Sequence, residues 1–317
     1  AMMEPPGGTA LVEESIAEAL DFRRAMRKVD AEFGDNDWWF QVWGPENLAE
    51  EGIGRANDWV LKRTDSEGVQ TGDGEESWHG FGDMAPGFNM LDPIKATIVT
   101  PGLNMKGDFA TSGIPASIVT KFLAEHGVVV EKTGLYSFFI MFTIGITKGR
   151  WNTLLTALQQ FKDDYDKNQP MWRTLPEFCQ KHRRYEKMGL RDLCQFVHEM
   201  YAKYDIARLT TEMYLSDLTP AMKPTDAFSQ IAHRNTERVP IDQLEGRITT
   251  SLITPYPPGI PLLIPGEVFN KKIVDYLKFS REFALACPGF ETDIHGLVVE
   301  DGLDGRKTYF ADCVKSL

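Results

Sequence analysis

The chain has 317 residues, of which 42% are hydrophobic and 25% charged, and its formal net charge at pH 7 is −12. This length predicts about two domains with room for a sizeable core. The acidic balance argues against nucleic acid or an anionic membrane as the main partner, because both favour a basic protein surface.

The first part of the chain predicts a long helix followed by alternating strands and helices. From Thr9 to Phe33 apolar residues recur every three or four positions, which predicts an amphipathic helix with Thr9 as its N-cap. The stretch "WWFQVW" at residues 38–43 predicts a strand, and residues 94–100 predict another. A helix is expected over residues 112–127, with a proline near its first turn and a glycine at its end.

Two further strands and a helix complete this α/β part. "VVVEKTG" at residues 128–134 predicts a short strand whose three valines are buried, and "YSFFIMFTIGI" at residues 136–146 predicts the next. The apolar run at residues 135–146 is too short to cross a bilayer as a helix. A helix is expected from about Lys148. Residues 35–165 therefore alternate strands and helices, which predicts an α/β arrangement.

The pattern changes near residue 168, where we expect a domain boundary. Residues 171–235 predict mostly helices, and a helix over 271–286 and a strand over 307–314 follow. Between them lies "TPYPPGIPLLIPGE" at residues 254–267, with five prolines and two glycines. This proline ribbon can be neither a helix nor a central strand along its whole length.

The chain lacks the common motifs of a self-contained active site. Its six histidines show no metal-ligand spacing, and neither a phosphate loop nor a nucleophile elbow is present. The four cysteines are widely spaced, which is typical of a reduced, cytoplasmic protein. They are Cys179, Cys194, Cys287 and Cys313.

The opening "AMMEPPGG" has neither the basic start nor the apolar segment of a signal peptide. Because the chain starts at an alanine and turns straight into a predicted helix, we expect it to be a segment of something longer.

Three residues remain as candidates for function, each with a structural alternative. Glu131 ends the "VVV" strand, either as a solvent-exposed strand end or as a carboxylate that holds a cation in a cleft. His79 in "SWHGF" is favoured as a hydrogen-bonded residue in a packed turn over a catalytic histidine. Tyr256 is presented by the proline ribbon, which is either a rigid linker or, because it is apolar, a segment packed on another domain or subunit.

Five segments together resemble one family. They are "SWHGF", "MLDPIKATIVTPG", "GIPASIVTKFLAEHGVVVEKTG", "LEGRITTSLITPYPPGIPLLIPGE" and "PGFETDIHG". In this order they are similar to the C-terminal half of the bacterial inducible-type ornithine/lysine/arginine decarboxylases, which are pyridoxal-phosphate enzymes of the aspartate-aminotransferase fold. The resemblance covers nearly the whole chain, and "PYPPGIPLLIPGE" is its most specific segment.

The resemblance implies a fold class and a division of the chain. Residues 1–34 would be the last helix of the cofactor domain, residues 35–168 the small α/β subdomain, and residues 169–317 a mostly helical α+β C-terminal domain. Enzymes of this family bind pyridoxal phosphate through a lysine next to a histidine. No His-Lys pair occurs in this sequence, so we expect the Schiff-base lysine to lie outside the chain and the chain alone to be inactive.

The resemblance also implies a reaction and a site. Glu131 would match an active-site glutamate with the charge to hold a distal ammonium, and Tyr256 a tyrosine near the substrate entrance. "EKTG" favours lysine as substrate, whereas "GITKGRWNTLL" and "MMEPPGG" are more similar to the arginine enzymes, and ornithine ranks third. We expect a homo-oligomer, with a dimer and larger rings as in the family. The alternative is a non-catalytic module for assembly or docking.

Overall fold

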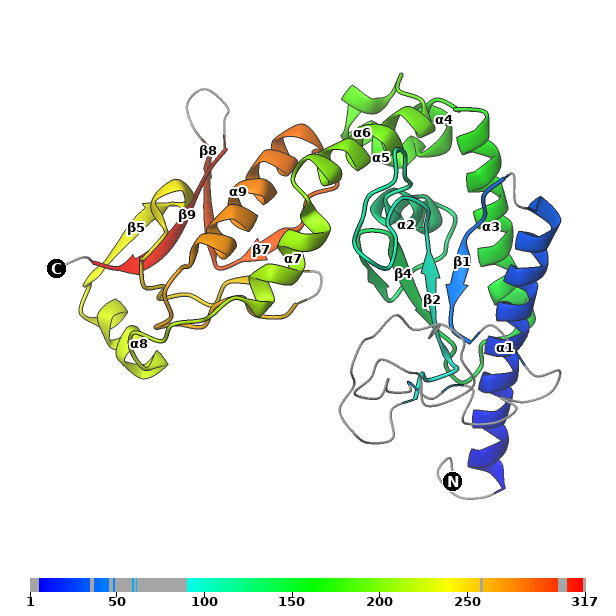
Figure 1. Cartoon of the computed structure of the whole chain (residues 1–317), viewed down its shortest axis with the longest axis horizontal. Helices are drawn as coiled ribbons and strands as arrows, with labels where there is room; N and C mark the ends of the chain where they lie inside the picture. The colour runs from blue at the N-terminus through cyan, green and yellow to red at the C-terminus, as the bar shows by residue number, and fades with distance from the viewer. Residues whose placement is uncertain are drawn as a thin grey trace, which may run out of the picture. The chain divides into compact units, whose positions relative to one another are not determined.

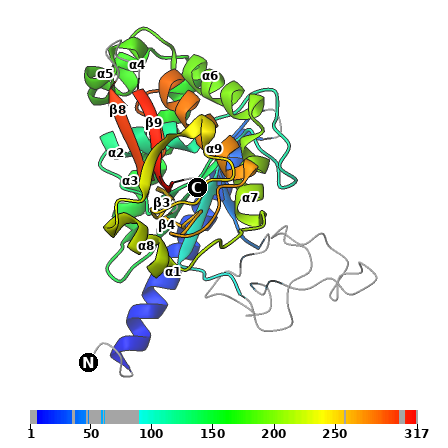
Figure 2. The ribbon, with the colours of Figure 1, turned by 90° about the vertical axis from the view of Figure 1, so that its left-hand side faces the viewer.

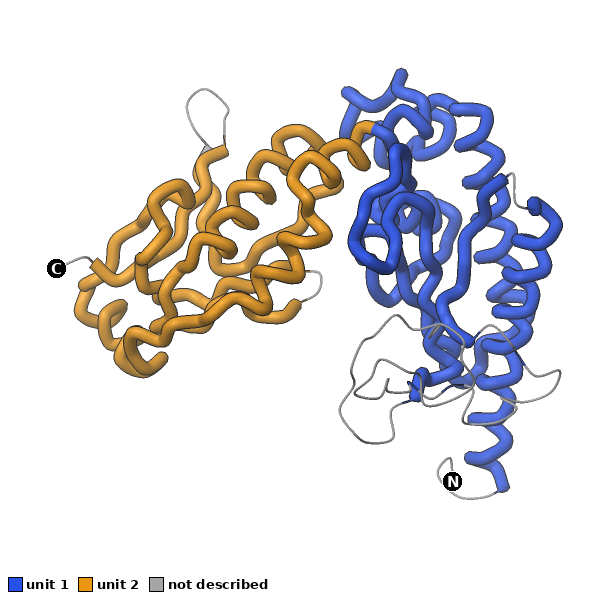
Figure 3. The backbone as a smooth tube through the Cα atoms, in the orientation of Figure 1, with its two compact units in different colours: residues 1–195 blue, residues 196–317 orange. Residues whose placement is uncertain are grey.

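The computed structural model describes residues 6–34, 37–45, 48, 59, 61, 90–256, 259–301 and 307–315. The chain forms two compact units, unit 1 up to Gln195 and unit 2 from Phe196 onward (Figure 3). The units divide inside a helix, α6 (Leu190–Lys203), and the domain boundary expected near residue 168 stays a prediction. "SWHGF" with His79 lies outside the described residues.

In the described part of unit 1, four strands form an antiparallel sheet. In spatial order they are β1 (Gln41–Trp43), β2 (Lys95–Val99), β4 (Ser137–Met141) and β3 (Lys132–Thr133). Thr97 of β2 faces Trp43 on one side and Phe139 on the other. The expected strands at 38–43, 94–100 and 136–146 are thus present, each shorter than predicted. The expected mixture of α/β elements is confirmed, with all strand pairs antiparallel.

The helices α1 (Gly7–Phe33) and α2 (Ala116–Glu125) pack against this sheet, and α3 (Lys148–Asp166) packs against both of them. Figures 1 and 2 show the first turns of α1 extending past the sheet, and the buried residues of α1 begin at Ser15. The prediction that Thr9 caps α1 is wrong: Gly7 and Gly8 are already helical, so Pro6 takes the cap position.

Two buried cations join α1 to the rest of unit 1. Arg23 donates to the carbonyl oxygens of Trp43 (2.8 Å) and Lys95 (2.7 Å), one in β1 and one in β2. Lys162 of α3 is 2% exposed and donates to Asp37 (2.8 Å) and Asp166 (2.7 Å). Its ammonium also lies 4.6 Å from the centre of the Phe33 ring, at the end of α1. Each buried charge is therefore hydrogen-bonded.

Unit 1 closes with short helices after a sharp turn. They are α4 (Met171–Thr174), α5 (Pro176–Lys181) and the 3-10 turn η2 (Arg183–Tyr185). Asn168, with φ of 47°, turns the chain after α3, and its side-chain oxygen accepts from the backbone nitrogen of Arg191 at 3.0 Å. Glu125 of α2 accepts from the nitrogen of Phe178 at 2.7 Å, so the start of α5 is tied to the end of α2.

Unit 2 combines helices with two small antiparallel sheets. The helices are α7 (Ile206–Leu215), α8 (Pro224–Ala232), η3 (Ile241–Gln243) and α9 (Lys271–Ala286). One sheet has the order β5 (Thr236–Pro240), β9 (Lys307–Val314), β8 (Leu297–Asp301), and the other pairs β6 (Thr254–Tyr256) with β7 (Asp293–His295). The predicted bounds of α9 and β9 are confirmed, as is the helical content of 171–235.

The proline ribbon is part of unit 2 rather than a linker between units. Leu262 and Leu263 are buried, and Ile253 hydrogen-bonds Leu263 through the backbone at 3.0 Å. Gly266, with φ of 97°, accepts from the backbone nitrogens of Ala221 and Met222. The linker alternative is therefore wrong, because the middle of the ribbon supplies core residues to its own unit.

The four cysteines are free, as the sequence predicts, and all four are buried. Burial raises the pKa of the Cys179 thiol to about 11, so that thiol stays protonated near neutral pH. Among the described residues, no helix has the length and apolar character needed to cross a membrane.

Candidate functional site

Glu131 stands at the start of the β3–β4 hairpin. The helix α2 ends at Glu125, and Gly127, with φ of 77°, redirects the chain toward the sheet. The backbone nitrogen of Glu131 then donates to the carbonyl oxygen of Phe139 at 2.9 Å, one position before β3 begins. The turn closes where Gly134 donates to Ser137 at 2.7 Å. Backbone bonds on the sheet thus fix the Glu131 position.

The expectation of three buried valines before Glu131 is wrong. Val129 is 87% exposed, and Val128 and Val130 are only half-buried. The reason is that β3 has two residues and pairs with β4 alone, so residues 128–130 precede the sheet instead of lying in its interior. The Glu131 side chain is exposed as well, and it lines a pocket.

The pocket of Glu131 has a volume of about 600 Å³ and lies between the sheet and α3, in the size range of small-molecule sites. Its lining residues come from the segment after α2, the end of β4 and the first turns of α3. They are Gly127, Val128, Val129, Glu131, Ile140, Met141, Phe142, Thr143, Ile146, Arg150, Trp151, Thr153 and Leu154.

The lining combines one acid and one base with an apolar wall. Glu131 is the only carboxylate and Arg150 the only guanidinium among the pocket residues, and no ion pair between them is formed in the described structure. Ile140, Ile146 and Leu154 supply aliphatic surface. Such a pocket can bind a ligand that has an aliphatic stem and a cationic end, with the cation held by Glu131.

A buried aromatic group supports the α3 side of the pocket. The Trp151 indole nitrogen donates to the Glu18 carboxylate at 2.6 Å. Its ring lies edge-on to Phe22, with centroids 6.0 Å apart, and Phe22 also contacts Phe142 at 5.5 Å. Since Glu18 and Phe22 belong to α1, that helix fixes the wall of the pocket from behind.

Tyr256 ends β6 in unit 2, where its side chain is 63% exposed. The backbone around it is constrained, because Pro255 is buried and accepts a bond from Gly259 at 2.8 Å. A Cβ at Gly259 would come within 3.2 Å of the tyrosine ring. Tyr256 therefore projects from a fixed turn, as its flanking prolines predict.

The neighbours of Tyr256 come from β7. The ring of His295 lies 6.0 Å from the Tyr256 ring, and its Nε2 is 3.3 Å from the Asp293 carboxylate. Asp293 pairs with Tyr256 in the strand register. Glu131 belongs to unit 1 and Tyr256 to unit 2.

Sequence reasoning missed Arg150 as a pocket residue. Arg150 and Leu154 lie four positions apart on α3 and line the same pocket, so the helical period places them on one face. The sequence alone shows this helical spacing of Arg150 and Leu154. What it could not show is that this face meets the segment that carries Glu131, since that depends on the packing of α3 against α2.

Two family models match most of the chain. Residues 1–150 match the model described as the Orn/Lys/Arg decarboxylase major domain, and residues 207–315 match the Orn/Lys/Arg decarboxylase C-terminal domain. The chain belongs to the ornithine/lysine/arginine decarboxylase family. The resemblance seen in the sequence is thereby confirmed.

Individual members of the decarboxylase family match almost the whole chain. Lysine decarboxylase LdcA of Pseudomonas aeruginosa is 46% identical over 99% of the chain and 41% of its own length. The biodegradative arginine decarboxylase of Escherichia coli is 34% identical over 99% of the chain and 42% of its own length. The chain therefore spans about two fifths of the length of these relatives.

A solved structure in the decarboxylase family shows the same fold. Lysine decarboxylase A from Pseudomonas aeruginosa aligns with a TM-score of 0.88 at 46% identity, covering 99% of this chain and 41% of that one.

The described pockets do not fit the family's cofactor. Pyridoxal phosphate needs a lysine for covalent attachment, an acid for its ring nitrogen and donors for its phosphate. Neither described pocket has a lysine among its lining residues, and the Glu131 pocket offers one carboxylate and one arginine. We therefore derive no chemical step through the cofactor from these residues. Their chemistry is that of ligand recognition.

Proposed function

We propose that this chain works as part of a pyridoxal-phosphate-dependent lysine decarboxylase, which releases CO2 from lysine and forms cadaverine. The observation that carries the proposal is the pairing of a carboxylate with an aliphatic wall in the Glu131 pocket. Membership in the family supports the reaction type, and the higher identity to a lysine decarboxylase (46%) than to an arginine decarboxylase (34%) supports the substrate.

In this proposal the chain contributes recognition of the substrate side chain. The distal ammonium of lysine is held by Glu131, and its methylene groups pack on Ile140 and Ile146. The cofactor, when bound by other residues of the protein, supplies the electron sink for loss of CO2. Tyr256 is proposed as a residue near the substrate entrance, which its exposed position on a rigid turn supports.

Arginine and ornithine remain the alternative substrates. Glu131 could also accept two parallel hydrogen bonds from the guanidinium of arginine, so the preference for lysine over arginine rests on the higher identity to a lysine decarboxylase. Ornithine has one methylene fewer than lysine, so its ammonium would fall short of a carboxylate placed for lysine. We further propose a cytoplasmic location, with which the four free cysteines are in keeping, and a homo-oligomer, as the family resemblance implies.

The proposal is tested with a protein that contains this chain together with a pyridoxal-phosphate-binding domain. Lysine, arginine and ornithine are assayed side by side for CO2 and amine release, while cofactor absorbance reports loading. We expect kcat/KM for lysine to exceed that for ornithine by about tenfold or more, the usual size of a one-methylene effect. A loaded protein that releases amine from none of the three would favour the alternative of a non-catalytic assembly module.

A further inference from the structure

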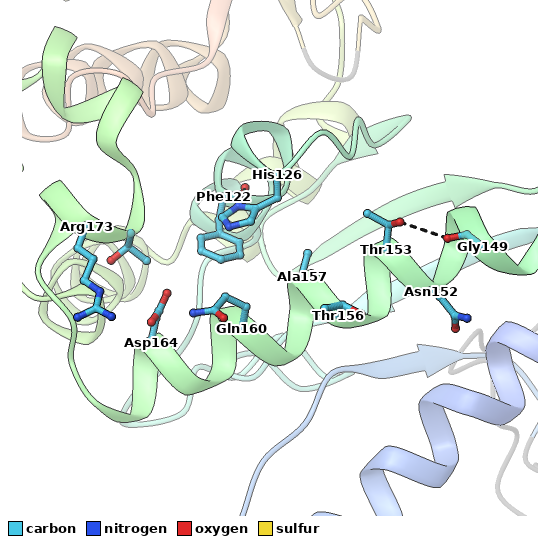
Figure 4. Close-up of a pocket in the computed structure, with 11 residues that line it drawn as sticks. Phe122, His126, Gly149, Asn152, Thr153, Thr156, Ala157, Gln160, Asp164 and Arg173 are labelled. Carbon is cyan, nitrogen blue, oxygen red and sulfur yellow. Dashed lines mark hydrogen bonds between the residues drawn. The ribbon is translucent and has the colours of Figure 1, made fainter.

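Unit 1 contains a second pocket, which follows α3 from its first turn to its last turns (Figure 4). Its volume is about 530 Å³, and it is bounded by the end of α2, by α3 and by α4. The lining residues are Phe122, His126, Gly149, Asn152, Thr153, Thr156, Ala157, Gln160, Asp164, Arg173 and Thr174. Only Thr153 is shared with the Glu131 pocket. We call it the Asp164 pocket.

Asp164 is a buried carboxylate that other side chains leave unpaired. It is 8% exposed. The described residues give its side chain no hydrogen bond or ion pair, although its backbone oxygen accepts from Gln169 at 2.8 Å. The acids beside it are paired: Asp163 with Lys167 at 3.5 Å and Asp166 with Lys162 at 2.7 Å. Because Asp164 lines the pocket and no described side chain occupies its carboxylate oxygens, it can accept hydrogen bonds from a cationic group inside the pocket.

Arg173 supplies the opposite charge at the same end of the pocket. After α3, the left-handed residue Asn168 turns the chain, and α4 contributes Arg173 and Thr174 to the pocket that Asp164 of α3 lines. Figure 4 shows the Arg173 guanidinium and the Asp164 carboxylate converging from opposite sides. They do not form an ion pair within the described structure. The space between them suits a molecule that carries both charges.

The rest of the lining suits a small and partly polar molecule. Thr156 and Gln160 present a hydroxyl and an amide along the exposed face of α3, and Phe122 and Ala157 give an apolar floor. The His126 ring stacks on Phe122 with centroids 4.0 Å apart. Its Nδ1 donates to the Phe122 carbonyl oxygen at 2.8 Å, which leaves Nε2 for a ligand.

We propose that the Asp164 pocket binds a free α-amino acid as its zwitterion. The α-ammonium is held by Asp164 and the α-carboxylate by Arg173, whose planar fork can donate two parallel hydrogen bonds to a carboxylate. The amino-acid side chain lies along the Thr156–Gln160 row over Ala157. This site is separate from the Glu131 pocket and does not require the chain to be a decarboxylase.

The test uses L-norleucine, because it has both α charges and lacks the distal ammonium that Glu131 would hold. Binding to the full 317-residue chain is measured by ligand-observed NMR and calorimetry. Pentylamine and hexanoate serve as half-ligands with one charge each, and all three ligands are compared in the Glu131→Gln chain, because pentylamine has the aliphatic stem and cationic end that suit the Glu131 pocket. We expect norleucine to bind at least tenfold more tightly than either half-ligand, because each lost charged hydrogen bond removes about a factor of ten.

Variants locate the binding. Asp164→Asn and Arg173→Gln should each weaken norleucine binding about tenfold or more, while Glu131→Gln should leave it unchanged. Arg173 is exposed, so its substitution should not perturb folding, and circular dichroism checks Asp164→Asn. Norleucine binding no tighter than that of the half-ligands, or binding that survives Arg173→Gln, would overturn the proposal. Loss of norleucine binding in Glu131→Gln would show that the amino acid binds in the Glu131 pocket instead.

Discussion

Unit 1 and unit 2 present their candidate residues in different ways. Glu131 and Tyr256 are both exposed next to short antiparallel strands. The pocket around Glu131 is held by side chains, through Trp151 on Glu18 and the packing of α1 behind α3. Tyr256 is held by the backbone, through prolines and glycines with positive φ. Unit 1 should therefore be sensitive to changes in side chains, and unit 2 to changes in backbone freedom.

The two units can be followed separately in one unfolding experiment. All seven tryptophans lie in residues 38–172, before unit 2 begins at Phe196. Tryptophan fluorescence therefore reports unfolding of unit 1, whereas circular dichroism reports helices of both units. A change confined to unit 2 should move the dichroism transition and leave the fluorescence transition in place.

The largest effect is expected from Gly266→Ala in the proline ribbon. A Cβ at position 266 would collide with the carbonyl oxygen of Met222, and the backbone φ of Gly266, 97°, is one that residues with a side chain rarely adopt. We expect a loss of about 3 kcal/mol or more in the free energy of unfolding of unit 2. Gly246→Ala is the matched control, because φ is 78° and nothing lies within 4 Å of its Cβ. It should lose about 1 kcal/mol. Equal effects of the two variants would contradict the backbone explanation.

A smaller effect is expected from Lys162 in unit 1. Lys162→Ala removes two charged hydrogen bonds and the stem that packs beside Phe33, and should lower the free energy of unfolding by about 2–3 kcal/mol. Lys162→Met keeps the stem and loses the charge, so about 1 kcal/mol is expected. Both losses should appear in the fluorescence transition. A shift seen only by circular dichroism would place the effect outside unit 1.

The charge contribution of Lys162 should depend on pH. The hydrogen bond from Lys162 lowers the pKa of Asp37 in the folded protein below the ordinary value of 3.8. The pair therefore stabilises the folded state fully above about pH 3.8, and this stabilisation is lost as the pH falls through the pKa of folded Asp37. Burial opposes the charge on Lys162, but its bonds to Asp166 and Asp37 outweigh burial and raise its pKa above 10.5. The stability gap between wild type and Lys162→Met should be constant from pH 5 to 9 and shrink in stronger acid. A gap unchanged at pH 2 would contradict this assignment.

The smallest effect on stability is expected at Tyr256. Its side chain is 63% exposed, so Tyr256→Phe should change the free energy of unfolding by less than about 0.5 kcal/mol. If Tyr256 lies at the substrate entrance, Tyr256→Ala should still raise KM for lysine several-fold in an active decarboxylase. Unchanged KM in Tyr256→Ala would remove Tyr256 from the proposed site.

The sequence predicted the long, periodic elements and the family. Helices α1, α2, α3 and α9 follow from apolar residues every three or four positions, and the bounds of α9 and β9 were correct. The strands β5 and β8 were missed, because both are short. In addition, β5 pairs with β9 far along the chain, whereas β8 pairs with β9 as the next strand. The error at Val129 has a similar cause: three β-branched residues favour a strand, but among the described residues no partner strand continues beside them.

The sequence also identified Glu131 and Tyr256 as candidates, mainly through family resemblance. It could not show that Arg150 shares the pocket of Glu131, or that Asp164 is buried beside Arg173. Acidic and basic residues on a helix usually indicate a solvated surface. Only the packing of α2, α3 and α4 in space distinguishes Asp164 from the paired Asp163 and Asp166.

The central claim is that Glu131 holds the distal ammonium of lysine, and steady-state kinetics of Glu131→Gln test it most directly. The variant is made in the cofactor-loaded decarboxylase, with Glu32→Gln as control because Glu32 is an exposed carboxylate on α1. We predict that Glu131→Gln raises KM for lysine about tenfold or more, since a charged hydrogen bond is lost, while cofactor absorbance stays unchanged. The Glu32→Gln variant should match wild type. Wild-type kinetics in Glu131→Gln would contradict the claim.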